Sequence, residues 1–166
     1  MLKKEIELLF EYDKWADIKM LGAAAGLNPD QYKKDLGSSF GGIHGTIVHI
    51  LSANHVWCCR WTGKISTPLK AEDIPSIEVV KKQWDTYHFE IGNFFQNLSD
   101  KELNESSGYT DFKGNSYSYP LYQQMLHKVN HSTYHRGQVV TLLRQLGTNV
   151  FNSDFINFIR QKESNG

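Results

Sequence analysis

The sequence lacks the features that mark several large classes of protein. It carries no net charge, because 18 basic residues balance 18 acidic ones, and this disfavours a nucleic-acid-binding surface. No window approaches the roughly 20 apolar residues that cross a membrane. The N-terminus is charged and amphipathic throughout, without the apolar core of a secretory signal. We therefore expect a cytoplasmic protein.

Cysteine is also scarce. Cys58 and Cys59 are the only two, and they are adjacent. Neighbouring residues on a helix point in different directions, so a disulfide between them is not expected. We interpret both as small, half-buried hydrophobic residues. Acidic residues offer no obvious cluster either, and Asp13, Asp17 and Glu90 are interpreted as isolated surface carboxylates.

What the sequence does contain is apolar residues at helical spacing in four long segments. The predicted helices cover residues 5–25, about 38–62, 76–97 and 120–146. Gly26 and Pro29 end the first, Ser76 fits an N-cap and Pro120 suits a first helical turn. Glycines near residues 41–45 weaken the start of the second helix, since each costs about 1 kcal/mol relative to alanine.

Two shorter segments complete the pattern. Tyrosine and phenylalanine alternate with polar residues on both sides of Lys113–Asn115, which predicts a short β-hairpin. The C-terminal "SDFINFIRQ" predicts a short helix capped by Ser153. The fold class is therefore all-α: one four-helix bundle domain over residues 1–166, with a small β excursion and a short C-terminal helix. Long connectors leave the order of the helices open.

Histidine provides the chemical signal. His127, His131 and His135 are spaced four residues apart on the last long helix, so their side chains share one face. An H-x-x-x-H pair is the arrangement that zinc proteases use, but their motif requires Glu directly after the first His. That position is Ser132 here, so a zinc protease is excluded.

A catalytic metal needs a third protein ligand. His49 lies near the apolar face of the second helix, which would place it opposite the last helix. His44 and His55 are out of phase with it. His127 lies a further turn, about 6 Å, beyond His131, so we expect it to line a pocket instead of binding the same ion. From spacing alone, metal ligands and hydrogen-bonded core histidines remain equally open.

Neighbouring residues receive simpler interpretations. His88 is expected to face solvent. Gly137 lies inside a helix at a stability cost, which a close helix–helix contact would explain. Arg136 and Gln138 are expected to form hydrogen bonds that orient the helix end or a partner chain.

Several motifs together resemble those of the DinB-like superfamily of metal-binding four-helix bundles. The most specific is "NHSTYHRGQVVTLLRQLG", which contains H-x-x-x-H-R-G-Q. "YDKWAD" at residues 12–17 and "IHGTIVHILSANHVW" at residues 43–57 resemble the motifs of the family's first and second helices. "SDFINFIRQ" resembles its closing segment. The resemblance covers most of the chain.

This resemblance implies an up-down-down-up bundle in which His49, His131 and His135 bind one divalent cation, most often nickel or zinc. It also implies a homodimer. Characterised relatives include bacillithiol S-transferases and mycothiol-dependent maleylpyruvate isomerase. An open position on the metal would bind a thiol and lower its pKa, which produces the nucleophilic thiolate.

The leading hypothesis is a metal-dependent enzyme that transfers a low-molecular-weight thiol to an electrophile, in detoxification or a stress response. Its partners would be small molecules, with no nucleic acid and no membrane. Tyr12, Trp15 and Trp57 are candidate pocket walls. Two alternatives stay open: a metal-dependent hydrolase, in which the open position holds water, and a stress protein that binds metal without catalysis.

Overall fold

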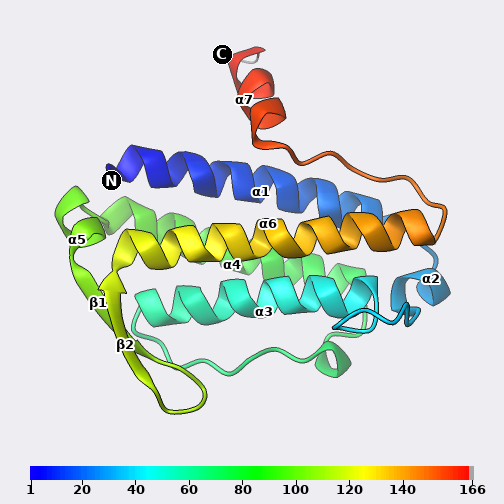
Figure 1. The fold of residues 1–166 in the computed structure, drawn as a ribbon, viewed down its shortest axis with the longest axis horizontal. Coiled ribbons are helices and arrows are strands. Elements are labelled where there is room, and N and C mark those ends of the chain that lie inside the picture. Colours follow the sequence, from blue (N-terminus) through cyan, green and yellow to red (C-terminus); the bar gives the residue numbers. More distant parts are fainter. Residues whose placement is uncertain (165–166) are drawn as a thin grey trace.

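The computed structural model describes residues 1–164, and four long helices lie side by side along its length (Figure 1). The elements are α1 (Lys3–Ala25), α2 (Pro29–Lys33), α3 (Ile43–Trp61), a 3-10 turn η1 (Ala71–Asp73), α4 (Ile77–Asn97), α5 (Asp100–Asn104), β1 (Ser106–Thr110), β2 (Ser116–Pro120), α6 (Leu121–Gln145) and α7 (Phe155–Ser164). The expected helical bundle is confirmed, together with the small β excursion before α6 and the short C-terminal helix.

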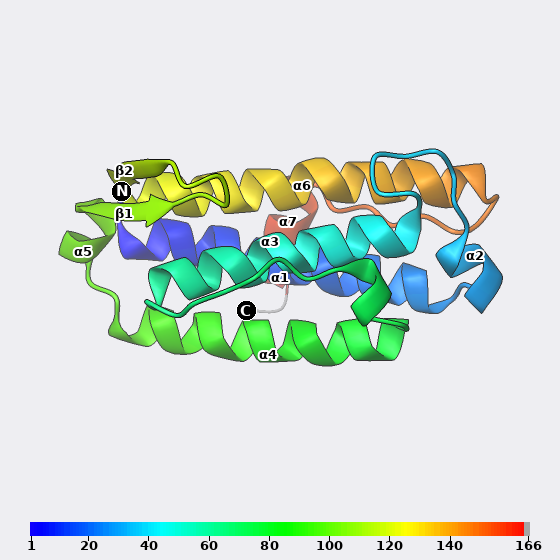
Figure 2. The ribbon, with the colours of Figure 1, turned by 90° about the horizontal axis from the view of Figure 1, so that it is seen from below.

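The direction of the helices follows from the connections between them. In Figures 1 and 2, α1 and α6 run one way along the bundle, and α3 and α4 run the other way. The segment from residue 62 to residue 76 therefore travels the length of the bundle to reach the start of α4. This is the up-down-down-up order. None of the helices in residues 1–164 has the length and apolar composition to cross a bilayer.

The hairpin is antiparallel, with Ser106 opposite Pro120 and Thr110 opposite Ser116. Asp111 organises its turn: the backbone N–H groups of Lys113 and Asn115 donate to the Asp111 carboxylate at 2.8 and 2.9 Å. The hairpin leads directly into the start of α6, since β2 ends at Pro120 and α6 begins at Leu121, and it extends away from that helix past the C-terminal end of α3 (Figure 1).

The structure differs from the prediction at the start of α3. The helix begins at Ile43, because residues 38–42 form a tight loop in which Gly41 has φ 78° and Ser38 bridges back to it. Here the glycines are needed sterically. A Cβ on Gly42 would lie 2.0 Å from the Lys34 carbonyl oxygen, and one on Gly45 would lie 1.9 Å from that of Phe40. The loop is therefore held tightly against the first turn of α3.

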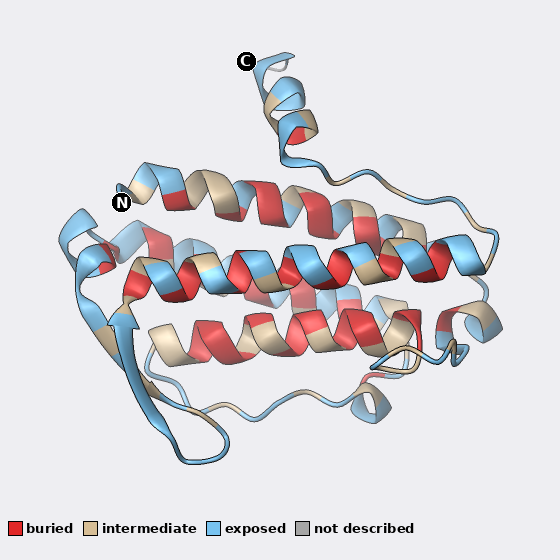
Figure 3. Ribbon diagram, viewed as in Figure 1, coloured by how far each residue is buried: buried red, intermediate tan, exposed pale blue. Residues whose placement is uncertain are grey.

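Buried faces point inward on all four long helices (Figure 3), but the core is not purely apolar. Asp13, Asp17, Lys128 and Arg136 are all at most 2% exposed. Arg136 donates to Asp13 at 2.6 Å and to Asp17 at 2.8 Å, and Lys128 pairs with Asp13. The interpretation of Asp13 and Asp17 as surface carboxylates is therefore wrong, and these ion pairs join α1 to α6.

Candidate metal centre

Three histidines converge between α3 and α6. His131 and His135 lie one turn apart on α6, and His49 faces them from α3. The His49 Nε2 atom lies 3.0 Å from His131 Nε2 and 3.2 Å from His135 Nε2. One nitrogen from each ring falls within a common span of 4.8 Å. The structure thus brings together the three side chains that the sequence selected.

The distances are compatible with ligands of one small cation. With metal–nitrogen bonds of about 2.05 Å, two imidazole nitrogens stand about 3.3 Å apart at a tetrahedral angle and about 2.9 Å apart at a right angle. The two closest separations, 3.0 and 3.2 Å, fall between these values. The three histidines could hold a metal ion, although its binding stays a prediction.

The protonation state of the rings also suits coordination. Burial lowers the pKa of His49 to about 4, with the nearby His135 ring as a second cause. Burial lowers the pKa of His131 further, to about 3, again helped by His135. Both imidazoles are therefore uncharged at neutral pH, which leaves a lone pair on the nitrogen that would bind a metal.

A phenylalanine from the loop before α3 covers the cluster. The Phe40 ring stacks on the His49 ring with 3.9 Å between centroids and 16° between planes, and it meets His135 edge-on at 5.5 Å. The tight packing of this loop on Gly42 and Gly45 holds Phe40 in that place. Sequence reasoning missed Phe40, and the glycines on either side of it were the available signal.

Gln138 is a second residue whose role becomes clear only in the structure. Its Oε1 lies 2.8 Å from His135 Nδ1. Because a carbonyl oxygen can only accept, Nδ1 carries the proton and Nε2 keeps its lone pair. Gln138 was expected to form an orienting hydrogen bond, but not to this ring. Such partners fix the tautomer of a metal-binding histidine.

The other histidines lie outside the cluster. His44 Nε2 contacts the Ile74 carbonyl oxygen at 2.7 Å, and His55 Nε2 lies 3.8 Å from Cys59 Sγ. The His127 ring is 6.1 Å from that of His131 and packs edge-on against Trp57, so it lines a pocket as expected. Both cysteines are free and buried.

Two expectations for this region are wrong. The His88 side chain is 11% exposed and lies 4.0 Å from buried Asp17, so it does not face solvent. A Cβ on Gly137 would have no neighbour within 4 Å, so no close helix contact explains that glycine. Arg136 does form hydrogen bonds, but they run to the buried aspartates of α1 instead of to the helix end or a partner chain.

Comparison with known proteins agrees with this architecture. The family model described as the DinB family matches residues 1–165. The chain belongs to the DinB family. Protein DinB of Bacillus subtilis (strain 168) is 24% identical to this DinB-family chain in a 149-residue alignment that covers 84% of this chain and 84% of that protein. The crystal structure of a DinB-like protein from Bacillus cereus ATCC 10987 superposes with a TM-score of 0.66 at 20% identity, covering 87% of this chain and 94% of that one.

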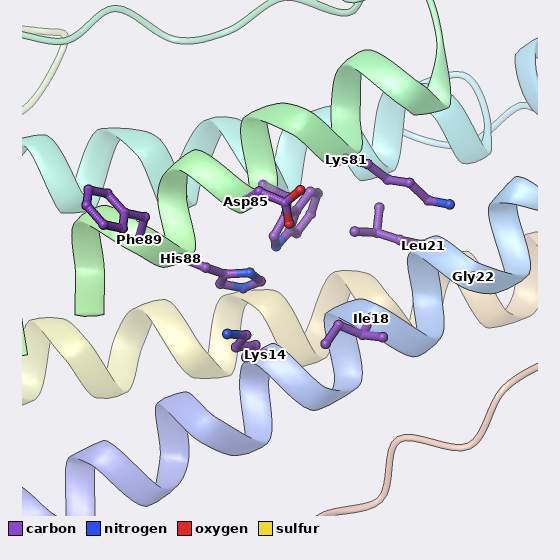
Figure 4. A pocket seen from close by; sticks show the side chains of 9 residues that line it. Lys14, Ile18, Leu21, Gly22, Lys81, Asp85, His88 and Phe89 are labelled. Atoms are coloured by element: carbon purple, nitrogen blue, oxygen red, sulfur yellow. The ribbon is translucent and has the colours of Figure 1, made fainter. Parts of the chain in front are cut away.

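A large surface pocket of this DinB-family protein lies between α1 and α4 (Figure 4). It measures about 590 Å³ and is lined by residues of α1 and α4, including Lys14, Ile18, Asp85 and His88. None of the three clustered histidines lines it. Of the candidate pocket walls, Trp57 lines a different pocket beside His127. Tyr12 and Trp15 pack against α7 instead.

Replacing Gln138 with leucine is expected to weaken metal binding without unfolding the protein. The change removes the acceptor for His135 Nδ1 while keeping a side chain of similar length. Loss of such an orienting partner typically costs 10–100-fold in metal affinity. Competition titrations with a chromophoric chelator would measure the dissociation constant.

Gln145→Leu is the matched control for this change. Gln145 is exposed and lies seven residues further along the same face of α6. The control should keep the wild-type metal affinity. Equal affinities for Gln138→Leu and wild type would mean that the hydrogen bond does not orient the ligand.

Proposed function

We propose that this DinB-family protein is a divalent-metal-dependent enzyme that transfers a low-molecular-weight thiol to an electrophile. His49, His131 and His135 would hold nickel or zinc, within one domain that spans residues 1–166. The observation that carries the proposal is the convergence of three imidazole nitrogens, two of them 3.0 Å apart, between α3 and α6. Three protein ligands are typical of catalytic metal sites, whereas structural sites use four.

A bound divalent cation would supply a positive charge that keeps a thiol in its reactive thiolate form at neutral pH. The thiol must come from a second molecule. Burial raises the pKa of the Cys58 thiol to about 12 and also raises that of Cys59, so the chain's own cysteines are poor nucleophiles. This favours a thiol cosubstrate over a cysteine of the protein.

The residues around the cluster have distinct tasks in this proposal. His49 and His131 are partly exposed and His135 is only 8% exposed, so small molecules would approach from the side of the first two rings. Phe40 covers the face of the His49 ring and excludes water there. Gln138 holds the His135 tautomer.

The test is thiol transfer by purified, untagged protein loaded with nickel or zinc. Cysteine would serve as the thiol and chlorodinitrobenzene as the electrophile, so that the thiolate sulfur forms a C–S bond as chloride leaves, and absorbance follows the thioether. We expect a rate above the uncatalysed one that falls to background after chelation and in His135→Ala. His55→Ala, which alters a histidine outside the cluster, should retain the wild-type rate.

The outcomes separate the alternatives. Stoichiometric metal without transfer across a panel of small thiols and electrophiles would overturn the proposed reaction, and ester hydrolysis by the same preparation would favour a hydrolase. The reaction belongs in the cytoplasm, where small thiols stay reduced. Light scattering on the same preparations would test the homodimer that the family resemblance implies.

A further inference from the structure

A second pocket lies between the hairpin and the helices that carry the histidines. Its volume is about 240 Å³, and its walls are Trp57 on α3, Tyr109 and Tyr119 on the hairpin, and Gln123, Gln124 and His127 on α6. His127 connects it to the metal centre, since the His127 and His131 rings are 6.1 Å apart. The pocket therefore lies one helical turn from the candidate metal ligands.

The walls suit a flat aromatic ligand. Tyr109 and His127 both meet the Trp57 ring nearly at right angles, at 5.0 Å and 71° and at 5.4 Å and 66°. Rings in this arrangement present both faces and edges to a ligand, so an aromatic ligand could stack on one ring and meet another edge-on, the two geometries that aromatic pairs prefer. A cavity of about 150 Å³ already admits benzene. About 240 Å³ is therefore enough for a substituted ring.

The positive charge beside the pocket determines whether it favours an anionic or a cationic ligand. The Arg60 guanidinium lies over Trp57 and Tyr109, at 4.6 and 4.7 Å from their ring centres. Its one hydrogen bond is donated to the Thr110 carbonyl oxygen at 3.3 Å, and within residues 1–164 it forms no salt bridge. A guanidinium has five N–H donors, so most remain available to an anion.

No wall of the pocket is acidic. Asp111 in the hairpin turn acts on Arg60 from outside the pocket, but its carboxylate already accepts hydrogen bonds from other residues of that turn. An aromatic pocket without a carboxylate could hold an organic cation, but the positive charge of Arg60 lies over the Trp57 and Tyr109 rings and would repel one. A carboxylate, by contrast, matches the planar donor fork of an arginine. The local charge thus favours an anionic aromatic ligand over a cationic one.

The pocket is held in shape before any ligand arrives. The buried Gln124 donates from Nε2 to the carbonyl oxygens of Ser107 and Tyr119 at 2.8 and 3.0 Å, which ties both strands of the hairpin to α6. Its Oε1 accepts from Trp61 Nε1 on α3 at 3.2 Å. A preformed wall reduces the entropic cost of binding.

We propose that this pocket binds an aromatic ring that carries a carboxylate, with the ring against Trp57 and Tyr109 and the carboxylate on Arg60. If the protein transfers thiols, the electrophile is then an aromatic acid that also carries a leaving group such as a halide, and the halide departs as the thiolate forms the new C–S bond one turn from the metal. That assignment rests on the proposed function. The binding itself does not, so it can be tested without turnover.

The experiment is calorimetric titration of the intact protein with naphthoate and with its neutral analogue naphthamide. We expect naphthoate to bind about tenfold tighter, as one charge-assisted contact would give. Arg60→Gln should lower naphthoate affinity to that of naphthamide and leave naphthamide binding unchanged. Arg160→Gln, at an exposed arginine on α7, should match wild type. Tyr119→Ser, at a wall residue that is 45% exposed, should weaken both ligands.

Each titration is repeated on metal-loaded and metal-free protein, because a carboxylate could bind a metal directly. Equal naphthoate affinity in the two forms supports the Arg60 site. Binding that requires metal, a preference for naphthamide, the absence of binding, or an unchanged Arg60→Gln variant would each overturn the proposal. Naphthoate binding without any thiol transfer would support the binding site and contradict the proposed reaction.

Discussion

Replacing Arg136 with leucine is expected to reduce the free energy of unfolding by about 3–5 kcal/mol, the typical cost of removing one partner of a buried ion pair. The Arg136 guanidinium is fully buried and reaches both Asp13 and Asp17. Without it, Lys128 alone would balance two buried carboxylates. Urea denaturation followed by circular dichroism would measure the loss.

A second substitution distinguishes lost charge balance from lost packing. Burial, followed by repulsion from Asp13, raises the pKa of Asp17 to about 6, whereas the cations Lys128 and Arg136 lower the pKa of Asp13. Asp17 is therefore the carboxylate that most readily becomes neutral. We expect Asp17→Asn to recover part of the stability lost in Arg136→Leu, and to recover more than Asp13→Asn does.

The control for this prediction is Arg144→Leu, at an exposed arginine on the same helix. Its effect should stay within about 0.5 kcal/mol, as for most surface changes. If Arg136→Leu proved as stable as this control, the buried cluster would not contribute to stability in the way its geometry indicates.

Removing one of the three clustered histidines should have the largest effect on metal binding. We expect His131→Ala to weaken nickel or zinc binding by more than 100-fold. The reason is that loss of an orienting partner alone costs 10–100-fold, and this change removes a nitrogen 3.0 Å from His49 Nε2. Elemental analysis after dialysis and chelator competition would measure it.

His127→Ala is the matched comparison for His131→Ala, because His127 lies on the same face of α6, one turn before His131. It should keep the wild-type metal affinity. If His127→Ala lost the metal and His131→Ala kept it, the ligand set would be shifted by a turn and the assignment would be wrong. Circular dichroism would confirm that both variants are folded.

Two members of the histidine cluster could be paired from sequence because their geometry is local. His131 and His135 share a face through helical spacing alone, and the phase of His49 left few other candidates. Gln138 and Phe40 were not predicted as neighbours of the cluster. The first depends on which ring nitrogen faces it, and the second depends on the conformation of a loop.

The buried charges had a sequence signal that was overlooked. Residues 6, 10, 13, 17, 20 and 24 of α1 are all buried, at alternating spacings of four and three. Asp13 and Asp17 therefore occupy core positions of that pattern. Their partners on α6 lie more than 100 residues away in sequence. Carboxylates are rarely buried without such partners, so the pattern alone was not enough to place them inside.

The distance along the chain between the clustered histidines has a consequence for folding. His49 lies 82 residues from His131 and 86 from His135. An ion held by all three would close a long loop, as a disulfide does, and in the chain-entropy view a loop of this size is worth about 4.5 kcal/mol. Cys58 and Cys59 are both free and adjacent, and they close no such loop. Coordination at this site would thus cross-link the chain, and metal supply would set how firmly α3 and α6 stay joined.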